Sequence, residues 1–176
     1  RFLWHKDAAL QGSDAIVIPG GFSYGDYLRT GAIARFSPVM ASVKAFAEKG
    51  GRVLGICNGF QILQEAGMLD GAILRNRNVK YLSQRVYIKV EVTNTVATRG
   101  LKAGDVMGMP VAHGDGNLYF DDESLAKIEK EGRVVFRYCD SQGQLTDEAN
   151  VNGSRNAIAG ICNAGRNVVA LMPHPE

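Results

Sequence analysis

Four segments near the start of the chain alternate between two kinds of pattern, and this alternation constrains the fold more than any other feature. DAIVIPGG and RVLGI are short runs rich in isoleucine, valine and leucine, as in strands that are buried on both faces of a parallel sheet. SPVMASVKAFAEKGG and NGFQILQEAG have apolar residues at helical spacing and close with glycine. The order strand, helix, strand, helix predicts an α/β fold with a parallel sheet.

The rest of the chain predicts further strands and one helix. QRVYIKVEVTNT alternates apolar and polar residues through Val86, Ile88, Val90 and Val92, which is typical of an antiparallel strand with one solvated face. GDVMGMPVAHGDG, GRVVFRYCD, NAIAGICN and NVVALMPHPE also resemble strands, and ESLAKIEKEG resembles a short amphipathic helix. The chain has 176 residues, 45% of them hydrophobic, and contains no linker or repeat. We therefore predict one domain over residues 1–176.

Composition argues against several classes of protein. Twenty basic and 18 acidic side chains give a net charge of +2, so we expect no nucleic-acid partner. The most basic segment, LRNRNVKYLSQR, contains Arg75, Arg77, Lys80 and Arg85; we interpret it as a solvated loop, with a partner-docking patch as the alternative. No apolar stretch reaches the roughly 18 residues of a membrane-spanning helix. Three cysteines without CxxC or Cys/His ligand spacing favour a cytoplasmic protein without a disulfide framework or metal site.

Cys57 lies in the sequence GICNG, between a predicted strand and a predicted helix. G-x-C-x-G in this context has the form of a nucleophile elbow, with cysteine where hydrolases carry serine. A helix amino terminus lowers the pKa of a thiol there, and its free N–H groups can bind an oxyanion. The alternative is that a small hydrophobic side chain fills a tight corner. The local sequence leaves both interpretations open.

Of the three histidines, His174 in MPHPE has the best position for a catalytic base, because it follows the last predicted strand. Pro175 disfavours helical geometry at His174, and residues two apart in an extended segment project from the same side. Glu176 can therefore orient the imidazole, as the aspartate does in serine triads. His113 lies in VAHGDGN with Asp115; we interpret this segment as a plain turn, with acid–base or metal chemistry as the alternative.

The loop PGGFSYGD closes the first predicted strand. Backbone N–H groups at Gly20 and Gly21 can face the end of the neighbouring strand, and one of them could form an oxyanion hole together with the N–H of Asn58. A simple strand-end turn is the alternative. Neither GxGxxG nor GxxxxGK[ST] is present, which argues against a dinucleotide site or a P-loop.

Together these segments carry a family resemblance. PGGFSYGDYLRTGAIARF, GICNGFQIL, PVAHGDGN, NGS and MPHPE, in this order and at these intervals, resemble the glutaminase subunit of phosphoribosylformylglycinamidine synthase over nearly the whole chain. GGFSYGD separates this branch from other class I (triad-type) glutamine amidotransferases. The resemblance implies a flavodoxin-like, three-layer α/β sandwich with a central, mostly parallel sheet.

The resemblance also implies a reaction. Members of this family hydrolyse glutamine to glutamate and ammonia through a glutamyl thioester. The ammonia passes to a synthetase subunit, which converts formylglycinamide ribonucleotide to formylglycinamidine ribonucleotide in purine biosynthesis. The expected partners are this synthetase and a small accessory subunit. We expect no cofactor in this chain, with ATP and Mg²⁺ bound only by the synthetase.

The same resemblance implies roles for individual residues. Cys57 is expected to be the nucleophile, His174 the general base and later acid, and Glu176 the carboxylate that orients it. Gly21 and Asn58 are expected to donate hydrogen bonds to the oxyanion.

Gly20, Phe22 and Gln61 are expected to lie near the bound glutamine. The family normally has a further strand before the segment RFLWHKD and a helix after HPE, so we expect both to be missing from this chain; HGDG stands where HGEG is usual. Two alternatives remain open at this point. One is an amidotransferase that serves a different synthetase, and the other is a non-catalytic α/β redox or binding module.

Overall fold

The computed structural model describes residues 1–26 and 28–175 of the chain. Strands and helices alternate in the first part of the chain, and the rest consists mainly of strands. In chain order they are β1 (Ala15–Ile18), α1 (Pro38–Glu48), β2 (Arg52–Ile56), α2 (Asn58–Glu65), β3 (Ala72–Arg75), β4 (Leu82–Val90), β5 (Val106–His113), β6 (Asp115–Tyr119), α3 (Asp122–Lys130), β7 (Val134–Cys139), β8 (Ile158–Cys162) and β9 (Val168–Leu171).

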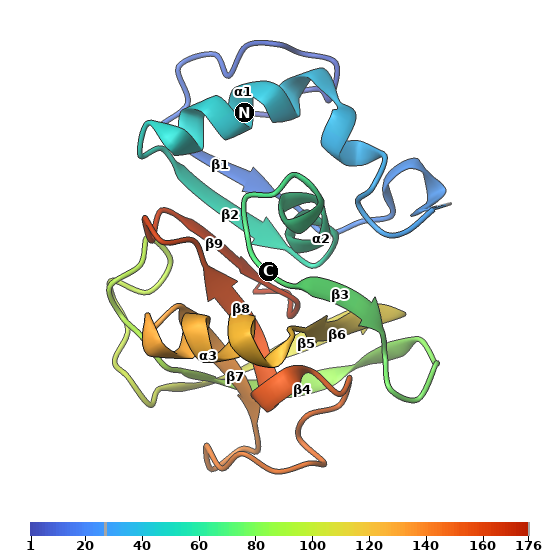
Figure 1. Cartoon of the computed structure of the whole chain (residues 1–176), viewed down its shortest axis with the longest axis vertical. Helices are drawn as coiled ribbons and strands as arrows, with labels where there is room; N and C mark the ends of the chain where they lie inside the picture. Colours follow the sequence, from blue (N-terminus) through green and yellow to red (C-terminus); the bar gives the residue numbers. More distant parts are fainter. Residues whose placement is uncertain (27, 176) are drawn as a thin grey trace.

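Seven of the strands form one sheet in the order β1-β2-β9-β8-β7-β4-β5, and β3 pairs with β6 in a small second sheet. Figure 1 shows β1 and β2 with α1 and α2 at one end of the molecule and β7, β4 and β5 at the other. The predicted strand–helix alternation and the α/β class are confirmed. The sheet is less parallel than expected: within the described residues, β1–β2 and β2–β9 are parallel, and the other neighbours are antiparallel.

A short connection explains why β8 and β9 are antiparallel. Residues 163–167 alone join β8 to β9. A parallel pair needs a crossover of a dozen or more residues, usually through a helix, whereas a short turn can only reverse the chain. Helical crossovers occur where the sequence supplies α1, and the strands around it are parallel.

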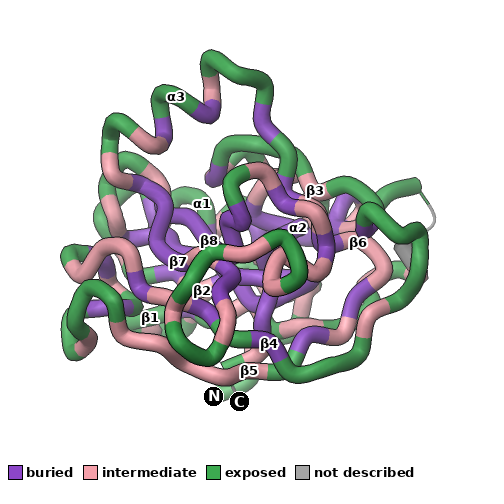
Figure 2. The backbone as a smooth tube through the Cα atoms, turned by 90° about the horizontal axis from the view of Figure 1, so that it is seen from below, coloured by how far each residue is buried: buried purple, intermediate pink, exposed green. Residues whose placement is uncertain are grey.

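The hydrophobic core runs through both halves of the sheet. Its largest fully buried side chains include Tyr138, Phe60, Phe120 and Leu63. Figure 2 shows buried backbone along β2, β7 and β8, while most of α3 is exposed. Within β4, the predicted alternation is confirmed, because Val86, Ile88 and Val90 are buried and Tyr87 is exposed.

The basic segment around residues 75–85 differs from the loop that we expected. Arg75 ends β3 and Arg85 lies within β4. Arg77 forms an ion pair with Asp147 at 2.6 Å. Strand pairing thus orders much of this segment. In the described part of the chain, none of the helices has the length and apolar character needed to cross a bilayer.

Candidate active site

Three parallel strands bring the predicted site residues to one edge of the sheet. Gly20 follows β1, Cys57 follows β2 and His174 follows β9, and these strands are neighbours. The Cys57 N–H donates to the carbonyl oxygen of Leu171 at 2.9 Å, which continues the pairing of β2 with β9 past the strand end. Because carboxyl ends of parallel strands meet at the same edge, residues more than 100 positions apart in the sequence share one corner.

Cys57 has the backbone geometry of a nucleophile elbow. Its φ of 49° and ψ of −107° are rare for a residue with a side chain, and α2 begins at the next residue. The side chain is buried, and its sulfur lies 3.8 Å from the carbonyl oxygen of Ala112, the acceptor of its S–H. A nucleophilic thiol is expected on strained backbone at a helix amino terminus. The same conformation costs free energy and would give no benefit to a residue that only fills space.

The two glycines around Cys57 allow α2 to lie against β1 and β2. A Cβ atom on Gly59 would stand 2.0 Å from the carbonyl oxygen of Ile18, and one on Gly55 would stand 2.6 Å from Cδ1 of Leu63. Real Cβ atoms do not approach other atoms so closely. The close approach of α2 to β1 therefore requires glycine at position 59, and a side chain at position 55 would have to displace Leu63.

His174 packs on the glycine loop that follows β1. A Cβ atom on Gly20 would lie 2.6 Å from Cε1 of His174, so the imidazole covers the face of this glycine. The backbone N–H of His174 donates to the carbonyl oxygen of Pro110 at 2.9 Å, which fixes the segment after β9. Glu176 lies outside the described residues, and its orienting role stays a prediction.

A chain of buried amide side chains connects the other predicted residues. Asn58 is the first residue of α2, where backbone N–H groups lack intrahelical partners. Its side-chain oxygen accepts a hydrogen bond from Ser23 Oγ, and its Nδ2 donates to Gln61 Oε1 at 2.8 Å. Gln61 Nε2 in turn donates to the carbonyl oxygen of Asp115 at 2.8 Å. The Gln61 amide therefore links the first residue of α2 to Asp115 at the start of β6. Its contact with glutamine stays a prediction.

Gly21 and Phe22 lie in the same loop as Ser23. Gly21 has a φ of 154°, which favours glycine. Phe22 is 76% exposed and borders an apolar cavity of about 920 Å³ beside β1, whose described lining does not include Cys57. The roles of both residues toward glutamine and the oxyanion stay predictions.

The turn between β5 and β6 forms a fixed wall of the site. Each consecutive carbonyl from Ala112 to Gly116 accepts a hydrogen bond from another segment of the chain. The donors, in order, are Cys57 Sγ, Asn76 Nδ2, the Asn76 N–H, Gln61 Nε2 and Asn152 Nδ2. A turn held at every carbonyl cannot move without disturbing α2 and Cys57.

His113, the last residue of β5, is a buried neutral histidine. Asn76 Nδ2 donates to the carbonyl oxygens of Lys80 and His113, so its Oδ1 faces His113 Nδ1 at 3.1 Å and accepts the hydrogen there. Burial, and to a smaller extent the charge of nearby His174, lowers the pKa of His113 to about 4. His113 is thus uncharged at pH 7, and His174 is the better candidate for proton transfer at Cys57.

The remaining cysteines lack an activating environment. Burial raises the pKa of the Cys139 and Cys162 thiols. All three cysteines are free of disulfides. Among the described residues, no group of His, Cys, Asp and Glu side chains gathers closely enough to hold a metal ion.

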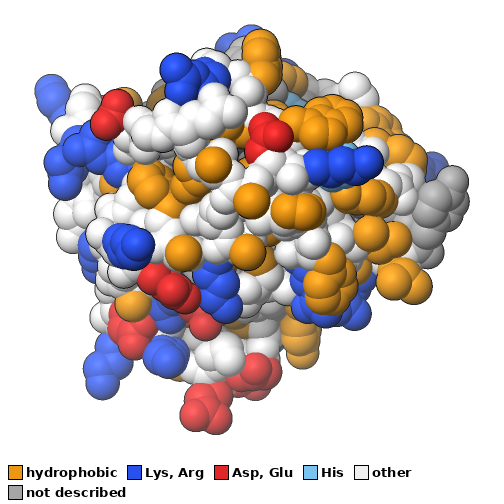
Figure 3. Space-filling view, turned by 90° about the horizontal axis from the view of Figure 1, so that it is seen from above, with side chains coloured by type: hydrophobic (Ala, Val, Ile, Leu, Met, Phe, Trp, Pro, Cys, Tyr) orange, Lys and Arg blue, Asp and Glu red, His pale blue; other side chains and the backbone are white. Residues whose placement is uncertain are grey.

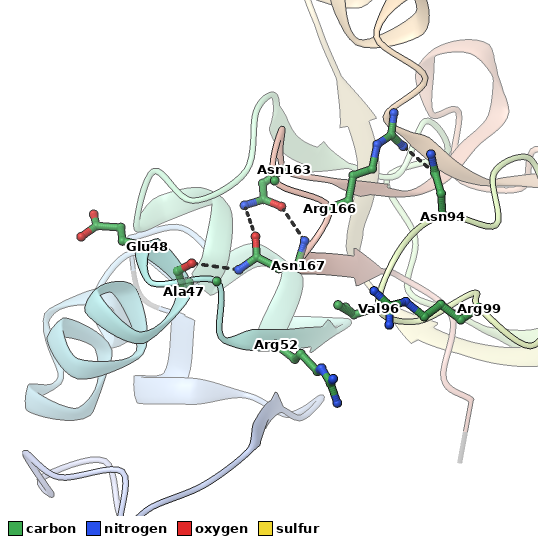
Figure 4. A pocket seen from close by; sticks show the side chains of 11 residues that line it. Ala47, Glu48, Arg52, Asn94, Val96, Arg99, Asn163, Arg166 and Asn167 are labelled. Carbon is green, nitrogen blue, oxygen red and sulfur yellow. Dashed lines mark hydrogen bonds between the residues drawn. The ribbon is translucent and has the colours of Figure 1, made fainter.

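A second, polar pocket lies at the opposite end of the sheet, where β2 and β9 begin (Figure 4). It has a volume of about 540 Å³, and its lining includes Arg52, Arg99, Asn163 and Asn167. In Figure 4, the Asn163 and Asn167 side chains point toward each other, and Asn163 Nδ2 donates to Asn167 Oδ1 at 3.0 Å. Its described lining contains neither histidine nor cysteine, so the edge that carries Cys57 remains the candidate active site.

Sequence reasoning missed several residues around Cys57. Ser23 and Asn152 lie within the motifs GGFSYGD and NGS, which supported the family resemblance without receiving a role. Asn76 and Tyr138 lie in segments that gave no chemical signal. A buried hydrogen-bond network depends on side-chain contacts across the fold, which no local pattern encodes.

Comparison with known proteins identifies the family of the chain. Residues 2–176 match the family model of the CobB/CobQ-like glutamine amidotransferase domain. "Phosphoribosylformylglycinamidine synthase subunit PurQ" of Koribacter versatilis is 59% identical over 99% of this chain and 76% of its own length. The PurQ subunit of Synechocystis sp. is 51% identical over 100% of this chain and 79% of its own length.

Solved structures show the same fold. A chain in the structure of PurLQS from Thermotoga maritima aligns with a TM-score of 0.81 and 41% identity, over 94% of this chain and 70% of its own. A second glutamine amidotransferase from Thermotoga maritima, at 17% identity and a TM-score of 0.56, shares the fold; the alignment covers 94% of this chain and 57% of that one. The chain therefore belongs to the CobB/CobQ-like glutamine amidotransferase family and, within it, to the PurQ subunits of phosphoribosylformylglycinamidine synthase.

Proposed function

We propose that this chain is a glutaminase that supplies ammonia to a formylglycinamide ribonucleotide synthetase. The observation that carries the proposal is the meeting of Cys57, Gly20 and His174 at the carboxyl ends of β1, β2 and β9, with Cys57 in an elbow conformation. A thiol on a strained strand–helix turn, with a histidine at the end of the neighbouring strand, is an arrangement suited to nucleophilic acyl transfer. Membership of the amidotransferase family identifies the acyl donor as glutamine.

The reaction follows from these positions. His174 accepts the thiol proton, and the Cys57 sulfur attacks the side-chain amide carbon of glutamine. The N–H groups of Asn58 and Gly21 donate to the oxyanion that forms. His174 then protonates the leaving nitrogen, and the C–N bond breaks to give ammonia and a glutamyl thioester. Finally, His174 activates a water molecule that attacks the thioester, the C–S bond breaks, and glutamate leaves.

The partners follow from the relatives. The Thermotoga maritima relative occurs in the PurLQS assembly, and we extend this to a synthetase and a small accessory subunit for the present chain. ATP and Mg²⁺ would bind to the synthetase, with no cofactor in this chain. On the face shown in Figure 3, basic side chains lie among acidic and hydrophobic ones, which supports a protein partner over nucleic acid. Three cysteines without CxxC or Cys/His ligand spacing support a cytoplasmic location.

Replacement of the nucleophile tests this function. Cys57→Ala should lower glutamine-dependent formation of formylglycinamidine ribonucleotide by at least about 10³-fold in the presence of the synthetase, because the thioester forms on the Cys57 sulfur. Ammonia-dependent formation should persist, since it bypasses this chain. A chloroketone analogue of glutamine should label Cys57 alone, as shown by peptide mass spectrometry.

Cys139→Ala is the matched control, because this thiol is buried and its pKa is raised. It should retain glutamine-dependent activity and labelling. Unchanged activity after Cys57→Ala would remove this residue as the nucleophile. Glutamine hydrolysis without transfer to formylglycinamide ribonucleotide would point to a different synthetase.

A further inference from the structure

A side-chain hydrogen bond joins the loop after β1 to the start of α2, directly after Cys57. Ser23 Oγ, in the loop, donates to Oδ1 of Asn58, the first residue of α2. The two expected oxyanion donors, the N–H groups of Gly21 and Asn58, belong to these same two segments. Both donors must lie at hydrogen-bond distance from one oxygen atom, so the bond that fixes the loop against the helix also bears on the oxyanion hole.

The direction of this hydrogen bond follows from a single carbonyl group. The carbonyl oxygen of Asp115 can only accept, so the Gln61 atom that faces it at 2.8 Å is Nε2. Gln61 Oε1 therefore faces Asn58 and accepts from its Nδ2 at 2.8 Å. Asn58 Oδ1 is left for Ser23, whose hydroxyl must donate. Both amides are buried, so removal of this hydroxyl would leave Asn58 Oδ1 without its donor.

The backbone of the loop gives the Gly21 N–H little support of its own. Within the described residues, no backbone hydrogen bond joins Gly21 or Phe22 to another element. Gly21 has a φ of 154°, and glycine populates positive and negative φ about equally well. The position of the Gly21 N–H therefore depends on how the residues that follow it are held.

Tyr24 holds the loop on its other side. Its hydroxyl lies 2.7 Å from His5 Nδ1 and 3.1 Å from Oγ of Ser37, the residue before α1. Its φ of 53° and ψ of 27° are left-handed, a conformation that a residue with a side chain keeps only when its surroundings enforce it. Ser23 and Tyr24 thus fasten the loop to α2 and to the start of α1.

We propose that Ser23 is a positioning residue for the oxyanion hole, whose hydroxyl holds the Gly21 N–H and the Asn58 N–H at the separation that one oxygen requires. The inference rests on the proposed glutaminase reaction, and it gives the GGFSYGD motif a role in that reaction. The oxyanion exists only after the Cys57 sulfur has attacked glutamine. Loss of the Ser23 hydroxyl should therefore slow turnover without weakening the binding of glutamine.

Ser23→Ala tests the proposal because it removes the hydroxyl and keeps Cβ. In the complex with the synthetase, kcat of the glutaminase reaction should fall about 10- to 100-fold while KM for glutamine stays within about two-fold. The second measurement is the rate of Cys57 alkylation by iodoacetamide, followed by peptide mass spectrometry. Displacement of iodide forms no oxyanion, so this rate should stay within about two-fold of that of the parent chain.

Ser23→Thr keeps an Oγ atom and should restore most of the turnover. Ser13→Ala is the matched control, because Ser13 is also half-buried and its Oγ donates to the carbonyl oxygen of Leu10 at 2.6 Å, before β1; it should leave kcat unchanged. An unchanged kcat in Ser23→Ala, a change in KM alone, or an equal slowing of alkylation and turnover would each overturn the proposal. Failure of the proposed function would instead appear as full glutaminase activity in Cys57→Ala.

Discussion

At the scale of single residues, the buried imidazole of His113 makes stability depend on pH. Its pKa is about 4 in the folded chain, against an ordinary value of 6.5. Between these values the unfolded chain binds a proton that the folded chain does not, so stability is fully present above pH 6.5 and is lost as pH falls toward 4. The loss amounts to roughly 3 kcal/mol for this group.

His113→Gln should remove this part of the pH dependence, because glutamine does not titrate. The free energy of unfolding, measured with urea at pH 7.5 and pH 5, should fall by about 2 kcal/mol less in the variant than in the parent chain. His5→Gln is the control, since this histidine lies outside the core and should leave the difference between the two pH values unchanged. An identical pH response in His113→Gln would show that His113 titrates normally in the folded chain.

At the scale of elements, α2 depends on glycine at position 59. Alanine normally stabilises a helix interior by up to about 1 kcal/mol relative to glycine. Here its Cβ would stand 2.0 Å from the carbonyl oxygen of Ile18, so β1 and α2 must separate. Gly59→Ala should therefore lower the free energy of unfolding by about 3 kcal/mol and lower glutaminase activity, because Cys57 moves with α2.

Gly100→Ala is the matched control, because a Cβ atom there meets nothing within 4 Å. Urea unfolding should show a change of less than about 0.5 kcal/mol for this variant. If Gly59→Ala were equally neutral, the close approach of α2 to β1 would not be a requirement of the elbow.

Local patterns predicted most elements and only part of their arrangement. β1, α1, β2 and α2 follow from apolar runs and glycine stops, and the alternation in β4 predicted its buried face. The antiparallel direction of β7, β8 and β9 was not predicted, because a buried run looks the same in either direction. For β8 and β9, the short turn at residues 163–167 decides the direction, and this turn lies outside the apolar runs.

The residues of the candidate site, too, were predicted only in part. Cys57 and His174 were predicted because each follows a strand in a short motif with a chemical meaning. Asn152 was not, because its hydrogen bonds to Gly116 and Tyr138 join segments that are far apart in the sequence. Phe22 and Gln61 came from family resemblance, and the structure shows Gln61 holding Asn58 and Asp115 together.

At the scale of the whole molecule, the carboxyl and the amino ends of the parallel strands have different roles. The carboxyl ends carry Cys57 and His174, and the amino ends are tied together by Asn167. This side chain is 9% exposed, and its Nδ2 donates to the carbonyl oxygens of Ala47 at 2.8 Å and Gly51 at 2.7 Å. Figure 4 shows that it reaches from the turn before β9 toward the end of α1. One amide thus links the antiparallel half of the sheet to the α1–β2 connection.

Asn167→Ala should separate stability from catalysis. The loss of two donated hydrogen bonds leaves buried carbonyls without this partner, which should lower the free energy of unfolding by about 2 kcal/mol in urea. The kcat/KM for glutamine should stay within about two-fold below the unfolding transition, because the opposite end of the sheet holds the site. Asn94→Ala is the control: Asn94 is exposed, accepts one hydrogen bond from Arg166 at 2.8 Å, and should change stability by less than about 0.5 kcal/mol. A large fall in kcat/KM for Asn167→Ala at full folding would mean that the amino ends of β2 and β9 control the position of Cys57 after all.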